Sequence, residues 1–185
     1  MTKDPDSYWC CWSYTADFKG YVTDVLPTVE GLAKYWAITL RNKKVAVISS
    51  DNPYSKGISE GMKPLFKAAG WTITVDEMVP YGEVNDWSAI LAKVRQDPPD
   101  LVINADYLPG NSALFLKQFL QKPTNSLVFL QYAPSVPEFV KLTGEQSNGV
   151  LYDLIGGPLD SPKWPRAQTL LKGFKDKYGV DSGAY

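Results

Sequence analysis

Polar and aromatic side chains gather where the chain leaves its predicted β-strands. Open α/β sheets bind their ligands beyond the carboxyl ends of the strands, so side chains that follow several parallel strands meet at one rim. Tyrosine, amide and hydroxyl groups at such a rim suit a small polar ligand held by hydrogen bonds and ring contacts. A single tyrosine there is often a half-buried core residue, but three on one rim favour a binding surface. The rim residues are Ser50, Asp51, Asn52 and Tyr54, then Asp106 and Tyr107, then Gln131, Tyr132 and Ser135, and last Ile155, Gly156 and Gly157.

The sequence lacks the residues on which most enzyme sites depend. It contains no histidine, which is the commonest general base and metal ligand. Cys10 and Cys11 are adjacent, and neighbouring cysteines reach disulfide geometry only with strain, so we interpret them as buried, inert thiols. No dinucleotide fingerprint, phosphate loop or G-x-S-x-G elbow occurs. We therefore expect no enzyme, no cofactor and no metal site; the open alternative is a carboxylate-based hydrolase that uses Asp51 or Asp106.

Charge and hydropathy narrow the classes of partner. The net charge of −1 gives no electrostatic footprint for nucleic acid or an anionic membrane surface. No apolar run is long enough to span a bilayer, and residues 1–6 lack the basic and apolar regions of a signal peptide. The expected partner is a small molecule, not a nucleic acid.

Short β-branched apolar runs alternate with stretches of helical periodicity along most of the chain. Five such β-α units predict an α/β fold with a doubly wound, Rossmann-like parallel sheet and helices on both faces. With 185 residues, the chain is long enough for one such domain. The predicted strands are 44–49, 71–75, 101–104, 127–130 and 149–152, and the predicted helices are 53–69, 86–97, 112–121, 136–142 and 165–178.

Individual residues predict where several elements begin, bend or end. Asp86 is expected to cap the second of these helices, and Gly70 to end the first as a left-handed residue. Pro64 is expected to kink or split that first helix. Before the first β-α unit, the pattern predicts a strand over 8–14 and a helix over 29–40.

Three stretches carry a resemblance to a known family. Residues 44–70 (KVAVISSDNPYSKGISEGMKPLFKAAG) look like the opening β-α unit of the second lobe in type I periplasmic solute-binding proteins of the branched-chain amino acid, urea and amide kind. Residues 82–103 (GEVNDWSAILAKVRQDPPDLVI) and 123–151 (PTNSLVFLQYAPSVPEFVKLTGEQSNGVL) resemble the following segments of that lobe. Each motif is weak alone, but their order and spacing are specific, and the similarity runs from about residue 8 to the end of the chain.

The resemblance implies a ligand-binding module that works with the membrane permease of an ABC-type uptake system, in the periplasm or outside the cytoplasm. It implies that Tyr54, Tyr107 and Tyr132 face the ligand, with Asp106 and Gln131 beside them. Tyr132 stands where amino-acid binders of the family usually place a glutamate, and a neutral phenol cannot neutralise an ammonium group. A neutral amide, urea-like or aromatic solute therefore fits at least as well as an α-amino acid, unless Asp106 replaces the glutamate. The alternative function is a ligand-sensing lobe of an amide-responsive regulator or receptor.

The resemblance also implies that residues 1–185 form one lobe of a two-lobed protein. We expect the first lobe and the C-terminal return across the hinge to lie outside this sequence. One lobe would then bind ligand weakly or undetectably, because half of the contacts would be missing. An incomplete sheet edge or exposed interlobe surface could also produce a non-native dimer of the chain.

Overall fold

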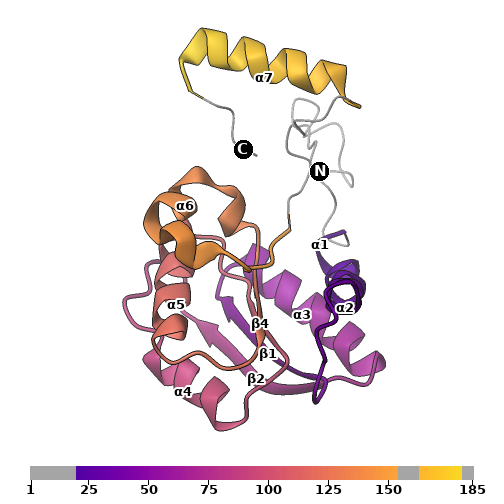
Figure 1. The fold of residues 1–185 in the computed structure, drawn as a ribbon. Coiled ribbons are helices and arrows are strands. Elements are labelled where there is room, and N and C mark those ends of the chain that lie inside the picture. The colour runs from indigo at the N-terminus through magenta and orange to yellow at the C-terminus, as the bar shows by residue number, and fades with distance from the viewer. Residues whose placement is uncertain (1–19, 154–162, 181–185) are drawn as a thin grey trace, which may run out of the picture.

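The structure is a computed structural model that describes residues 20–153 and 163–180 (Figure 1). Its centre is a four-stranded parallel sheet in the order β2-β1-β3-β4. The strands are β1 (Lys44–Ser50), β2 (Thr72–Val79), β3 (Leu101–Asn104) and β4 (Leu127–Leu130). The predicted α/β fold with a parallel sheet is confirmed.

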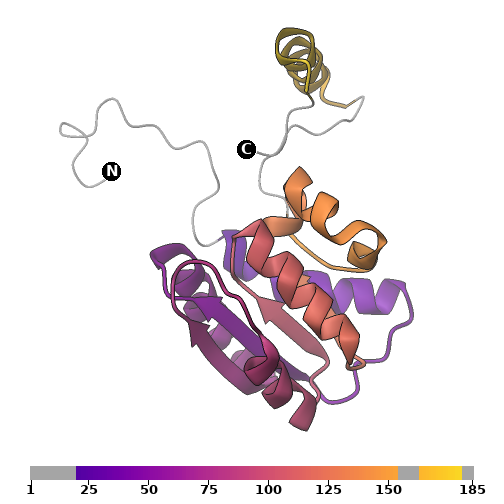
Figure 2. The same ribbon diagram turned by 90° about the vertical axis from the view of Figure 1, so that its left-hand side faces the viewer.

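Helices follow each strand of the sheet and also precede the first one. They are α1 (Gly20–Thr23), α2 (Val25–Tyr35), α3 (Pro53–Ala68), α4 (Ser88–Gln96), α5 (Pro109–Gln121), α6 (Pro137–Thr143) and α7 (Pro165–Tyr178), with short 3-10 turns η1 (Ala133–Ser135) and η2 (Gly144–Ser147). Buried side chains of α1, α2 and α3 pack on one face of the sheet, and those of α4, α5 and α6 pack on the other (Figures 1 and 2). The sheet is therefore covered on both sides, as the near-continuous apolar strands predict.

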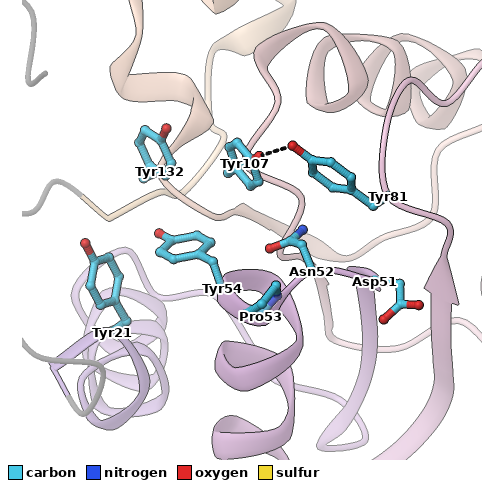
Figure 3. Close-up of a pocket in the computed structure, with 8 residues that line it drawn as sticks. All are labelled: Tyr21, Asp51, Asn52, Pro53, Tyr54, Tyr81, Tyr107 and Tyr132. Atoms are coloured by element: carbon cyan, nitrogen blue, oxygen red, sulfur yellow. Dashed lines mark hydrogen bonds between the residues drawn. The ribbon is translucent and has the colours of Figure 1, made fainter. Parts of the chain in front are cut away.

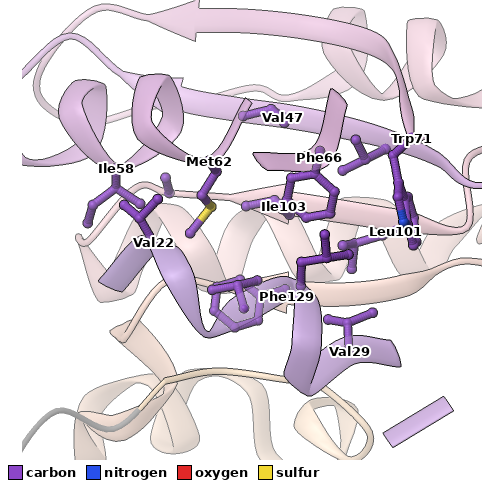
Figure 4. Packing of buried hydrophobic residues seen from close by; sticks show 14 of the residues in the cluster. Val22, Val29, Val47, Ile58, Met62, Phe66, Trp71, Leu101, Ile103 and Phe129 are labelled. Atoms are coloured by element: carbon purple, nitrogen blue, oxygen red, sulfur yellow. The ribbon is translucent and has the colours of Figure 1, made fainter. Parts of the chain in front are cut away.

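Alternation along each strand divides the core into two layers. In β1, Val45 and Val47 join the cluster under α1–α3, whereas Ala46 and Ile48 join the cluster under α4–α6. Figure 4 shows the first cluster, in which Met62 of α3 lies among aliphatic and aromatic side chains. Because both faces of β1 are packed this way, a slip of one residue in its pairing would exchange the two layers, so the packing fixes the register.

The edge strand β2 is the most polar strand of the sheet. Its pairing with β1 contains one irregularity, since Val45 pairs with Ile73 but Ala46 pairs with Val75, which leaves Thr74 as an extra residue. Asp76 and Glu77 on this strand form ion pairs with lysines of α3 and α4. Charged side chains and a bulge on an edge strand discourage pairing with another chain.

Several predicted boundaries are confirmed and others are wrong. Helix α7 begins and ends as predicted, and Gly70 follows α3 with φ +79°. The helix predicted over 29–40 is α2, which lies earlier, at Val25–Tyr35. Helix α3 continues through Pro64, so this proline does not split it. The strand predicted over 8–14 and the adjacent cysteines lie outside the described residues.

The fifth predicted strand, 149–152, is reduced to a single parallel bridge between Leu151 and Phe129 of β4. Gly149 has φ +86°, and the Val150 amide donates to Ser147, so the chain is still turning where the apolar run begins. Within this run, the bridge to β4 is made by Leu151. An apolar run alone did not reveal this local turn.

The amino ends of the strands are fastened by one buried carboxylate. Asp100, 3% exposed, accepts hydrogen bonds from the backbone amides of Asn42 and Lys43, each at 2.8 Å, and from Arg41 Nε at 3.2 Å. Burial alone would raise the pKa of Asp100, but these donors outweigh it and hold the pKa below its usual value. This cluster joins the entry of β1 to that of β3, at the end of the sheet away from the predicted rim.

Candidate ligand-binding site

A cavity of about 640 Å³ lies at the carboxyl edge of the sheet (Figure 3). It receives residues from the chain that follows β1, β2, β3 and β4, and from α1. Its described lining residues are Tyr21, Asp51, Asn52, Pro53, Tyr54, Tyr81, Tyr107 and Tyr132. Five of the eight are tyrosines, so the wall combines aromatic faces with phenolic hydroxyl groups.

A buried polar cluster fixes the turn from β1 into α3. The Asn52 side chain caps α3 by accepting a hydrogen bond from the Ser55 amide at 2.9 Å. Its Nδ2 donates to Ser50 Oγ at 2.6 Å and to Ser55 Oγ at 3.0 Å. Pro53 occupies the first turn, where the missing N–H costs nothing. Tyr54 therefore leaves a rigid helix start and lies in the cavity wall.

Tyr54 is the centre of the aromatic wall. Its ring meets those of Tyr21, Tyr107 and Tyr132 at centroid distances of 5.6, 5.8 and 6.2 Å, with interplanar angles of 83°, 84° and 87°. Edge-to-face pairs at such distances are favourable because the ring edge is positive and the ring face negative. Rings that meet at near right angles form adjoining walls and not a stack, as Figure 3 shows.

The loop after β3 is organised by Asp106, which is completely buried. Its carboxylate accepts hydrogen bonds from the Leu108 amide at 2.9 Å and from Asn111 Nδ2 at 2.6 Å. Burial raises the pKa of Asp106, although these two donors act in the opposite direction. Asp106 thus holds the backbone that presents Tyr107, and its own side chain lies behind the wall.

Asn111 connects that loop to the one after β2. Its side chain donates to the Gly82 carbonyl at 2.8 Å and accepts from the Val84 amide at 2.9 Å. This connection places Tyr81 beside Tyr107, with their hydroxyl oxygens 3.1 Å apart. The hydrogen bond to Tyr81 raises the pKa of Tyr107 to about 12, and burial and nearby negative groups act in the same direction. The shift moves the pKa of Tyr107 further above physiological pH, where a tyrosine phenol is neutral even at its ordinary pKa.

The loop after β4 is held by a second inner carboxylate, Asp153. It accepts hydrogen bonds from Gln131 Nε2 at 2.7 Å and from the Tyr132 amide at 3.0 Å. Burial raises the pKa of Asp153, and these donors partly oppose the rise. Gln131 is completely buried, and its Nε2 also lies 3.5 Å from the Tyr54 hydroxyl. This chain of contacts sets the position of Tyr132 relative to Tyr54.

The structure brings together three of the five predicted site residues on the cavity wall: Tyr54, Tyr107 and Tyr132. Asp106 and Gln131 are not on the wall, because both are fully buried and bonded to the residues that support it. The two aspartates proposed as a hydrolase pair are also separated in role, since Asp51 is exposed at the wall and Asp106 is enclosed behind it. Ile155, Gly156 and Gly157 lie outside the described residues.

Sequence reasoning missed three contributors: Tyr21, Tyr81 and Asp153. Tyr81 follows the end of β2, so the same strand-end rule would have found it had that strand been considered. Asp153 directly follows the predicted strand at 149–152, so the strand-end rule would also have identified it. Tyr21 precedes the first strand in a short helix, and no local pattern distinguishes it from a core residue.

The described residues on this wall offer recognition groups and no catalytic apparatus. They are phenols, one amide, one proline and one carboxylate. Within residues 20–153 and 163–180, no three acidic or cysteine side chains come together to hold a metal ion. No described helix is long and apolar enough to cross a membrane.

Comparison with known proteins places this site in a family context. The periplasmic binding protein family matches residues 6–182. Among curated relatives, the Leu/Ile/Val-binding protein BraC3 of Rhizobium johnstonii is 24% identical over 142 residues, which are 77% of this chain and 38% of the relative. The chain thus spans well under half the length of that relative.

Solved structures also resemble this chain, and it again spans less than half of their length. One from Silicibacter pomeroyi, assigned to branched-chain amino acid ABC transporters, is 32% identical, with a TM-score of 0.85 over 98% of this chain and 45% of that one. The leucine-binding protein LivK of Thermotoga maritima shares the fold at 22% identity, with a TM-score of 0.66 over 84% of this chain and 43% of that one.

Proposed function

The chain belongs to the periplasmic binding protein family, and from this premise we propose that it forms one wall of the ligand cleft in a solute-binding protein of an ABC-type uptake system. The observation that carries the proposal is the tyrosine-lined cavity at the carboxyl edge of the sheet, where open α/β folds bind ligands. The relatives and neighbours of the chain are binding proteins, not enzymes. The partners of the complete protein would be its solute and a membrane permease, and its location would be the periplasm.

The solute is a small polar molecule, of the amino acid, urea or amide type, seated against Tyr54, Tyr107 and Tyr132. The cavity volume of about 640 Å³ falls within the usual range for small-molecule sites. Tyrosine hydroxyls and the Asn52 side chain supply hydrogen-bond donors and acceptors, and the rings supply apolar contact. Asp106, Gln131 and Asp153 act behind this wall as positioning residues that keep the loops in place.

The proposal is tested by observing the tyrosines directly. The chain contains 11 tyrosines, and five of those in the described residues line the cavity, so 3-fluorotyrosine labelling and 19F NMR separate site residues from the others. Titration with leucine, urea, acetamide and choline should shift the cavity resonances saturably for at least one solute. One wall supplies only part of the contacts, so a dissociation constant on the order of 1–10 mM is expected.

The matched control is a tyrosine far from the cavity. Tyr35 is 82% exposed at the end of α2, so Tyr35→Leu should leave the titration unchanged, whereas Tyr107→Leu should weaken it. Saturable shifts confined to tyrosines outside the cavity, or no saturable shift with any solute, would contradict the proposed site.

A further inference from the structure

Three carboxylates surround the tyrosine-lined cavity, and none of them is paired with a basic group in the described part of the chain. Asp51 is in the wall, and Asp106 and Asp153 lie directly behind it. The described residues that donate to the carboxylates of Asp106 and Asp153 do so with amide groups, and none of the three aspartates occurs among the ion pairs of the described residues. Of the three, Asp51 is the exposed carboxylate on the wall itself, so it is the one whose charge an occupant of the cavity meets.

The aromatic wall adds to the same negative potential. The face of a tyrosine ring carries negative charge and attracts a cation placed over it. Tyr54 and its three perpendicular neighbours line the cavity together, so an occupant meets several rings at once. No lysine or arginine occurs among the described residues that line the cavity, and Asp51 is the charged side chain there.

We infer that this wall recognises a positively charged, alkyl-substituted ammonium group of the solute, held by the rings of Tyr54, Tyr107 and Tyr132, while the charge of Asp51 elsewhere on the wall attracts it over a longer distance. This inference rests on the proposed function for the position of the site, and it replaces the neutral urea-like and amide solutes by a cationic class. Aromatic rings replace the single glutamate that would neutralise a compact ammonium by a salt bridge. Alkyl groups on the nitrogen favour this arrangement, because they spread the charge and keep few bound waters to be lost.

An anionic solute is the least suitable occupant of this wall. A carboxylate against the ring faces would meet the negative end of each ring and the charge of Asp51. A neutral solute would gain apolar contact but would leave Asp51 without a counter-charge. The three solute classes therefore make different predictions for the same cavity.

The test compares choline with its neutral isostere 3,3-dimethylbutan-1-ol, in which carbon replaces the charged nitrogen. Benzoate and leucine represent the anionic and zwitterionic classes. In 19F titrations of the 3-fluorotyrosine-labelled chain, choline should saturate the cavity tyrosine resonances at a concentration about tenfold below that of the neutral isostere. Asp51→Asn should reduce the affinity for choline severalfold and leave that for the isostere within twofold, on the order expected for one exposed charge.

Two variants of one ring separate cation recognition from simple contact. Tyr107→Leu should lose more choline affinity than Tyr107→Phe, because phenylalanine retains the ring face. Tyr35→Leu, outside the cavity, should change neither. A circular dichroism spectrum and melting temperature like those of the unaltered chain will show that each variant is folded.

Each result decides a different part of the account. Equal binding of choline and its isostere at the cavity tyrosines would overturn the charge requirement, and tighter binding of benzoate or leucine would overturn the cation class. Both outcomes would leave the proposed solute site intact. If no solute perturbs the cavity tyrosines, the proposed site itself is wrong, and the inference falls with it.

Discussion

Replacing the partly buried carboxylate of Asp153 in two ways should have very different consequences. Asp153 receives the Gln131 side-chain amide at 2.7 Å and the Tyr132 backbone amide at 3.0 Å. In Asp153→Ala both donors lose their acceptor, and hydrogen bonds to a charged acceptor contribute about 1.5–3 kcal/mol each, less where water can enter. We expect Asp153→Ala to lower the free energy of unfolding by about 2–4 kcal/mol.

Asp153→Asn should be far milder because Gln131 can adapt. Gln131 Oε1 has no hydrogen-bond partner within the described part of the chain. If the Gln131 amide rotates by half a turn, this oxygen accepts a hydrogen bond from the new amide, while the remaining oxygen at position 153 still accepts from Tyr132. The free energy of unfolding at neutral pH should then stay within about 1 kcal/mol of the unaltered chain.

The pH dependence of stability supplies a second readout of the same residue. Burial raises the pKa of Asp153 in the folded chain above its usual value of 3.8. As pH falls through this raised pKa, the folded chain binds the proton before the unfolded chain does, so the contribution of this group to stability increases. It is fully present below the unfolded pKa and is lost again as pH rises through the folded pKa. Asp153→Asn should lack this pH-dependent contribution to stability. Asp106, whose pKa is also raised, should still make its own contribution in that variant.

The assay is urea unfolding followed by tryptophan fluorescence, at several pH values between neutrality and the usual aspartate range. The control is Asp176→Asn, which alters an exposed i,i+4 pair with Lys172 and should cost about 0.5 kcal/mol or less. Equal destabilisation by Asp153→Asn and Asp153→Ala would refute the adaptation of Gln131. An unchanged pH profile in Asp153→Asn would refute the assigned burial of the carboxylate.

Three further substitutions test the scaffold, each by the same unfolding assay. Asn52→Ala should lower the free energy of unfolding by about 1–2 kcal/mol through loss of the α3 cap, and a smaller loss than that of a typical surface substitution would contradict the capping geometry. Asp100→Asn should cost about 1–3 kcal/mol at neutral pH, because the amides of residues 42–43 lose a charged acceptor. Since the pKa of Asp100 is lowered, its contribution to stability is present above the unfolded pKa and is lost as pH falls through the folded pKa. The difference in free energy of unfolding between the unaltered chain and Asp100→Asn should therefore become smaller in acid. Trp87→Ala should cost about 3–5 kcal/mol, because this side chain is fully buried and packs edge-on against Phe115; a loss below about 1 kcal/mol would contradict that packing.

The sequence predicted the elements whose signals are local. Apolar runs identified β1, β3 and β4, and Gly70 marked the end of α3 through its left-handed conformation. The predicted cap at Asp86 is one residue too early: the N-cap of α4 is Trp87, and Asp86 accepts from the Ser88 amide at 3.0 Å just before it. The run at 149–152 failed because pairing there depends on the turn at Gly149 and not on hydrophobicity.

The site was predictable where strand ends alone determine it. Tyr54, Tyr107 and Tyr132 follow β1, β3 and β4, respectively. These strands are parallel and adjacent in the sheet, so the residues that follow them meet at the same edge. The supporting network was not predictable, because Asn111 and Asp153 act over 29 and 22 residues of sequence, respectively. Only the folded arrangement shows that Asp106 faces inward to Asn111 and not outward to the cavity.

A crystal structure of the chain grown with choline would test the central claim most directly. The account predicts a trimethylammonium group against the ring faces of Tyr54, Tyr107 and Tyr132, within the roughly 6 Å over which a cation interacts with an aromatic ring. Choline bound outside the cavity that these rings line, or bound in it with its trimethylammonium group turned away from all three rings, would contradict it.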